Sequence, residues 1–220
     1  MSIITFLILL LAVIVILLIR AEIKKDKSQL YVLKPLSTLL VIAVAVLSFF
    51  EPGRNLTYSV GVLIGLAFSF GGDVALMFQE KRKAFMVGLV LFLIGHITYI
   101  TVFILLGRFT YRDLISALLL FIPALAYYRL LKPNLGSMKV PVIIYMLIIS
   151  LMVNRAFSIF FSPLFSLDQA WMIFTGAFLF YLSDIVLAAN RFWRPMKYHR
   201  LSLTAYYTGQ LLIALSASNF

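Results

Sequence analysis

The chain has 220 residues, of which 63% are hydrophobic and only 12% charged, and its mean hydropathy is +1.06. A soluble domain of this size cannot bury so much apolar surface, so the composition predicts a protein whose solvent is a lipid bilayer. The absence of cysteine excludes disulfides, thiolate metal sites and a cysteine nucleophile. The net charge of +11 would suit a nucleic-acid partner, but its distribution along the chain indicates membrane topology and no nucleic acid.

Eight apolar segments follow one another along the chain, and each is long enough to cross a bilayer core of about 30 Å as a helix. They cover residues 3–19, 32–50, 56–78, 84–106, 112–131, 138–160, 169–190 and 200–217. The connections are short, carry turn-forming residues at 51–53 and 132–136, and leave no room for a soluble domain. We therefore predict an all-α polytopic membrane protein in which residues 1–220 form a single domain of eight transmembrane helices.

The lysines and arginines are concentrated in alternate connections. When helix-end residues are counted, the first, third, fifth and seventh connections hold 5, 3, 3 and 4 of the 19 basic residues. The positive-inside rule places these connections in the cytoplasm and both termini outside, as we expect for an integral protein of a bacterial inner membrane. Basic residues follow the first segment and none precedes it, which is the reverse of a signal peptide, so we expect this segment to be retained.

Two aspartates, Asp73 and Asp184, lie in matching surroundings inside the third and seventh segments. A glycine precedes each by eight residues, a glycine or serine directly precedes it, and a leucine follows three residues later. A carboxyl group in a lipid-spanning helix costs about 2.5–3.5 kcal/mol and usually marks a pathway or a site. Both segments run in the same direction, and at 1.5 Å per residue both carboxyls lie roughly 8–9 Å below the cytoplasmic boundary. We expect them to form a shared polar centre; a structural hydrogen bond to a neighbouring helix is the alternative for each.

The spacing of the two aspartate segments is compatible with an internal duplication. They are four segments apart, so the chain would consist of two parallel four-helix halves, at about 1–108 and 109–220. Chance similarity is the alternative, because glycine, leucine and phenylalanine are common in membrane helices.

Seven further polar residues are placed to face the same centre. Ser69 lies four residues before Asp73, on a helical stripe of small and polar residues, and Lys34 begins the second segment on the same side of the membrane. The others are His96 and Tyr99 in the fourth segment, Ser183 directly before Asp184, and Tyr206 and Gln210 in the eighth. Each also has a structural alternative, such as a packed histidine, a snorkelling lysine or an interfacial tyrosine.

Several common kinds of active site have no signature in this sequence. The chain contains no phosphate-cradling GxxxxGK[ST], no HExxH, no GxSxG elbow and no GxGxxG after a strand. With two histidines, one of them in a loop, we expect neither a metal centre nor a cofactor. The ionisable residues leave acid–base chemistry by carboxyl groups, or proton-coupled transport.

Five short motifs occur in order along the chain. They are KPLST at 34–38, GLAFSFGGDVALM at 65–77, GHITY at 95–99, FYLSDIVLA at 180–188 and YYTGQ at 206–210. In these motifs and in the eight-segment layout, essentially the whole chain resembles the YhhN/TMEM86 family. The resemblance implies a lysoplasmalogenase, which hydrolyses the vinyl ether of a lysoplasmalogen, a lysophospholipid, to a fatty aldehyde and a glycerophospho-alcohol.

The two aspartates suit this acid-catalysed reaction. A carboxylic acid must protonate the alkene, and a negative charge must stabilise the oxocarbenium-like cation; burial and a nearby second carboxyl favour one protonated partner. We expect Asp73 and Asp184 to fill these roles in either order. Lys34 would bind the phosphate or adjust the carboxylates electrostatically, and His96, Tyr99, Tyr206 and Gln210 would position water and glycerol oxygens. The alternative functions are a proton-coupled lipid or small-molecule transporter using the same aspartates, and a structural membrane protein.

Overall fold

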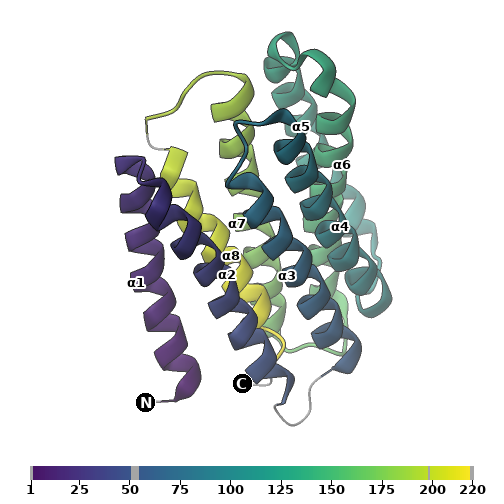
Figure 1. Ribbon diagram of the computed structural model, residues 1–220. Helices are drawn as coiled ribbons and strands as arrows, with labels where there is room; N and C mark the ends of the chain where they lie inside the picture. The colour runs from purple at the N-terminus through teal and green to yellow at the C-terminus, as the bar shows by residue number, and fades with distance from the viewer. Residues whose placement is uncertain (1, 51–54, 198, 219–220) are drawn as a thin grey trace.

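The computed structural model is a bundle of eight α-helices and describes residues 2–50, 55–197 and 199–218 (Figure 1). The helices are α1 (Ile3–Lys24), α2 (Lys27–Phe49), α3 (Leu56–Leu76), α4 (Arg82–Leu106), α5 (Tyr111–Leu131), α6 (Lys139–Phe157), α7 (Leu167–Phe192) and α8 (Ser202–Leu215). In the part of the chain that the structure describes, α1 to α7 are long and apolar enough to cross a membrane. The predicted all-α membrane fold is confirmed, with an eighth helix of 14 residues that is shorter than the predicted 200–217.

The helix ends depart from the predicted segments where the sequence provides caps. Lys25 ends α1 with a left-handed backbone at φ 56°, and the Asp26 side chain accepts a hydrogen bond from the Gln29 backbone N–H at 3.2 Å. An aspartate at this position satisfies a free donor of the first helical turn. As a result, α1 ends about five residues after its apolar segment, and α2 begins about five residues before its own. The turn at 132–136 forms two short 3₁₀ turns, whereas the one at 51–53 lies outside the described residues.

The helices alternate in direction, so α2, α4, α6 and α8 all begin at one end of the bundle, at the top of Figure 1. We call this the basic end, because the connections that hold most of the lysines and arginines meet here. Asp73 and Asp184 both lie near the basic end, three and eight residues before their helices finish. α1 begins and α8 finishes at the opposite end.

Glycines bring each aspartate helix close to the helix that follows it. A Cβ atom on Gly65 would lie 2.5 Å from the ring of Tyr99 in α4, and one on Gly176 would lie 2.7 Å from the backbone oxygen of Gly209 in α8. Any larger residue would therefore push the helices apart. These are the glycines eight residues before each aspartate, as a duplication would require. The division into two halves nevertheless stays a prediction.

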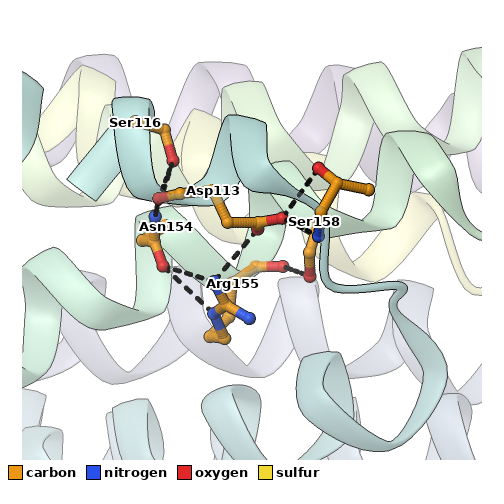
Figure 2. A network of polar contacts seen from close by, with 6 residues as sticks. Asp113, Ser116, Asn154, Arg155 and Ser158 are labelled. Atoms are coloured by element: carbon orange, nitrogen blue, oxygen red, sulfur yellow. Dashed lines mark hydrogen bonds and ion pairs between the residues drawn. The ribbon is translucent and has the colours of Figure 1, made fainter.

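A buried polar cluster joins the start of α5 to the last turn of α6 (Figure 2). It lies at the end of the bundle opposite the basic end (Figure 1). The Asp113 carboxylate accepts hydrogen bonds from the Thr110 backbone N–H at 2.6 Å and from Arg155 Nη2 at 3.0 Å. The Asn154 amide donates to the Asp113 carbonyl at 2.8 Å. Because both carboxylate oxygens of Asp113 are occupied and the residue is 1% exposed, we interpret the cluster as structural. It anchors α5, the least buried of the seven membrane-spanning helices.

Candidate active site

Asp73 lies in the last turn of α3, where α2 and α8 supply its partners. Its Oδ2 atom accepts hydrogen bonds from Thr38 Oγ1 at 2.6 Å and from the Tyr206 hydroxyl at 2.7 Å. The Lys34 Nζ atom lies 3.7 Å from Asp73 Oδ1. All four residues are buried, so bulk water screens these contacts little. An ammonium and two hydroxyl donors thus surround the carboxyl group of Asp73.

Asp184 is held from α6 and α4. The Tyr145 hydroxyl donates to Asp184 Oδ2 at 2.5 Å, and His96 Nε2 lies 3.0 Å from that hydroxyl and 3.7 Å from Asp184 Oδ2. His96 is 1% exposed, and its Nδ1 atom has no hydrogen-bond partner among the described residues. The aromatic ring of Phe180 stacks edge-on against the imidazole at 4.8 Å. The three polar groups therefore form one hydrogen-bonded chain that orients the Asp184 carboxyl group.

One cavity brings the two aspartates together. Its volume of about 60 Å³ is enough for a few water molecules. It is lined by Lys34, Asp73, Leu76, Phe92, Ser183, Asp184, Leu187, Ser202, Leu203 and Tyr206. The rings of Phe92 and Phe180 stand edge-on against Tyr206, with centroids 6.0 and 5.0 Å away, and hold its hydroxyl in place. We call this space the carboxyl cavity.

Two spaces of opposite polarity adjoin the carboxyl cavity. An apolar pocket of about 60 Å³ lies between α4, α5, α6 and α7, and Asp184, Leu76 and Leu187 line both it and the carboxyl cavity. At the basic end, two cavities of about 330 and 190 Å³ form a polar vestibule. The vestibule cavities share Glu22, Lys34, Leu76, Gln79, Glu80 and Arg200. Lys34 borders both the vestibule and the carboxyl cavity, so the vestibule, the carboxyl cavity and the apolar pocket adjoin in that order. This order fits a ligand with a polar head and an apolar chain.

Four of the seven supporting residues from the sequence lie at the carboxylates. Lys34 and Tyr206 contact Asp73, and His96 reaches Asp184 through Tyr145. Ser183 lines the carboxyl cavity, although its hydroxyl donates to a backbone carbonyl one turn earlier in α7 at 2.8 Å. The ion pair with Asp73 also favours electrostatic adjustment over phosphate binding as the role of Lys34.

The other three supporting residues lie deeper in the bundle. Ser69 is buried one turn before Asp73, Tyr99 packs against Gly65, and Gln210 is buried one turn beyond Tyr206 in α8. Within the described ranges, the Tyr99 hydroxyl and both side-chain amide atoms of Gln210 have no hydrogen-bond partner. The structure therefore does not bring these residues to the carboxylates.

Three residues of the site were not among those selected from the sequence. Thr38 donates to Asp73, Tyr145 donates to Asp184, and Tyr207 donates to the Lys34 carbonyl at 3.3 Å. Thr38 lies one turn after Lys34, and this spacing alone could have identified it. Tyr145 stands in an apolar stretch of α6 without a polar neighbour in sequence, so no local pattern identifies it.

The fold and the site together define an integral membrane protein with two buried carboxyl groups at one cavity. No group of three or more histidine, aspartate or glutamate side chains in the described part of the chain could hold a metal ion. The sequence pattern that defines the YhhN family matches residues 29–217. The chain therefore belongs to the YhhN family, as its motifs predict.

Curated relatives match most of the chain at moderate identity. A protein from Bos taurus named lysoplasmalogenase TMEM86A is 35% identical over 163 residues, which are 71% of this chain and 64% of the relative. The human protein of the same name is 33% identical over 161 residues, with the same coverage. Lysoplasmalogenase TMEM86B from Mus musculus is 33% identical over 195 residues, 86% of this chain and 75% of the relative. The chain thus spans slightly less than two thirds of the length of the TMEM86A relatives, and no solved structure matches it.

Proposed function

We propose that this protein is an intramembrane hydrolase that cleaves the vinyl ether bond of a lysoplasmalogen to a fatty aldehyde and a glycerophospho-alcohol. The observation that carries the proposal is that Asp73 and Asp184 line one small cavity between a polar vestibule and an apolar pocket. The names of the relatives support the substrate class.

The chemistry of a vinyl ether gives each carboxyl group a distinct task. An acid transfers a proton to the alkene carbon on the side of the alkyl chain, and positive charge develops on the carbon bonded to oxygen. Water then adds to that carbon and loses a proton, and the resulting hemiacetal collapses to aldehyde and alcohol. A proton donor is therefore required toward the chain, and a negative charge with a bound water toward the head group.

The arrangement of the spaces supports Asp184 as the proton donor. With the head group in the vestibule and the chain in the apolar pocket, the alkene lies in the carboxyl cavity. Asp184 lines both this cavity and the apolar pocket, which supports a role for it at the carbon on the chain side. Tyr145 forms hydrogen bonds with both Asp184 and His96, and these bonds can reverse direction together, which suits a carboxyl group that gives up its proton during the reaction.

Asp73 is then the carboxylate that stabilises the cation and accepts the proton of the attacking water. Lys34 and two hydroxyl donors surround its oxygens and would stabilise negative charge there as it develops, and Lys34 also lines the vestibule. Because these groups are fixed before the substrate binds, they need little reorganisation when charge develops. The carboxyl cavity has room for the water molecule that the reaction consumes.

The alternative of a proton-coupled transporter has no support in the comparisons, whose relatives are named as enzymes. Product analysis in D₂O separates the two functions. A hydrolase releases a fatty aldehyde that carries one deuterium on the carbon next to the carbonyl group, together with the glycerophospho-alcohol. A transporter leaves the lysolipid intact, and that result from folded protein would refute the proposed function.

The distribution of basic residues supports a location in a bacterial inner membrane with the basic end in the cytoplasm and both termini outside. The vestibule opens at the basic end. In this orientation, substrate enters from the cytoplasmic leaflet.

A further inference from the structure

The vestibule contains two guanidinium groups whose donors are not fully used. Arg191 and Arg200 both line its larger cavity of about 330 Å³. Arg191 donates to the backbone carbonyl of Gln79 at 3.3 Å and lies 5.0 Å from the ring centroid of Phe85, but it forms no ion pair with any described carboxylate. Arg200 forms an ion pair with Glu22 at 3.8 Å, but its buried Nε has no hydrogen-bond partner among the described residues.

The other charges that line the same cavity are already paired. Lys34 faces Asp73 at 3.7 Å, Glu80 forms an ion pair with Lys27 at 3.2 Å, and Glu22 forms one with Arg200 at 3.8 Å. The lining of the larger cavity holds three cationic and two anionic side chains, so it carries one excess positive charge, and Arg191 is the cation that forms no ion pair among the described residues. A planar guanidinium with free N–H groups can donate two parallel, charge-assisted hydrogen bonds to the oxygens of a phosphate. A phosphate therefore fits this cavity better than a neutral group does.

We propose that Arg191 and Arg200 bind the phosphate diester of the substrate's head group, an inference that rests on the proposed function. The vestibule and the carboxyl cavity share Lys34, Leu76, Leu187, Ser202 and Leu203, so they are contiguous. In a lysoplasmalogen, three glycerol carbons separate the phosphate from the vinyl ether oxygen. A phosphate held by the arginines consequently directs the vinyl ether toward the carboxyl cavity, and it sets the direction in which the lipid binds.

Two substrates that differ only in the phosphate test this assignment. In Arg200→Gln and Arg191→Gln, we expect the KM for a lysoplasmalogen to rise about tenfold or more, as for the loss of a charge-assisted hydrogen bond. The KM for a 1-O-alkenylglycerol, which has no phosphate, should stay unchanged. Lys83→Gln is the matched control, because Lys83 is an exposed cation at the basic end outside the vestibule lining, and it should change neither KM. Equal losses for both substrates, or no loss for the lysoplasmalogen, would overturn the assignment.

Binding without turnover keeps this test independent of the proposed reaction. A 1-O-alkyl lysophospholipid lacks the alkene, and its affinity should fall about tenfold in the arginine variants, whereas that of a 1-O-alkylglycerol should not. Failure of the parent protein to cleave either vinyl ether would refute the hydrolase alone. Unchanged affinity of the variants for the alkyl lysophospholipid would refute the phosphate site. Binding of inorganic phosphate alone as tightly as the lysophospholipid would assign the arginines to a free anion instead.

Discussion

Removal of one hydroxyl group, in Tyr206→Phe, should slow the reaction without disturbing the fold. The Tyr206 hydroxyl donates to Asp73 Oδ2 at 2.7 Å in a fully buried setting. A hydrogen bond to a charged group contributes about 1.5–3 kcal/mol. If this contribution is needed by the carboxylate that stabilises the cation, kcat falls roughly 10- to 150-fold, since each 1.36 kcal/mol is a factor of ten.

Tyr207 offers a matched control at the adjacent position. Its hydroxyl is also buried, but it donates to the neutral backbone carbonyl of Lys34 at 3.3 Å. Tyr207→Phe should therefore lower kcat by no more than about fivefold. The assay is the rate of aldehyde release from saturating lysoplasmalogen in detergent, with the unfolding temperature of each variant measured alongside.

A second donor to the same oxygen tests the reasoning further. Thr38→Val removes the 2.6 Å hydrogen bond to Asp73 Oδ2, and the double variant with Tyr206→Phe should lose more activity than either single variant. Full activity in Tyr206→Phe, or an equal loss in Tyr207→Phe, would show that the hydroxyl donors do not act through the carboxylate.

Three other predictions concern the remaining parts of the structure. Tyr145→Phe should lower kcat about tenfold with little change in KM, because Asp184 loses the hydroxyl donor that orients its carboxyl group; an unchanged kcat would contradict this. Arg155→Met should lower the free energy of unfolding by about 3–5 kcal/mol, because it leaves Asp113 buried and unpaired, while folded protein keeps its activity; unchanged stability would contradict the structural role. In this cysteine-free chain, Lys83→Cys should react with an impermeant maleimide only after the cells are opened, and Arg108→Cys in intact cells; the reverse pattern would invert the proposed orientation.

The sequence was sufficient to predict the helices and the two central acids. Long apolar segments have one stable form in lipid, so α1 to α7 follow from hydropathy, and the matched surroundings of Asp73 and Asp184 identified both carboxyl groups. Lys34 and Tyr206 could also be predicted, because topology places them at the same depth as Asp73. Depth and helical face are the two quantities that such a sequence encodes well.

The contacts between helices could not be predicted in the same way. Periodicity defines the polar face of a helix along its whole length, but the carboxyl cavity occupies only the turns nearest the basic end. The sequence placed three residues on the correct faces of their helices, but they lie too deep in the bundle to reach the carboxyl cavity: Ser69, Tyr99 and Gln210. Tyr145 was missed for the converse reason: its role depends on the packing of α6 against α4 and α7, which no pattern within α6 reveals.

The most direct test of the central claim is aldehyde release from a lysoplasmalogen by the purified protein and by its Asp73→Asn and Asp184→Asn variants. Asparagine preserves the shape of each side chain but can neither donate an acidic proton nor carry the negative charge. We expect aldehyde from the parent protein and a loss of at least about a thousandfold in each variant, with both variants folded and able to bind a 1-O-alkyl lysophospholipid. Substantial aldehyde release by both variants would contradict the paired-aspartate mechanism.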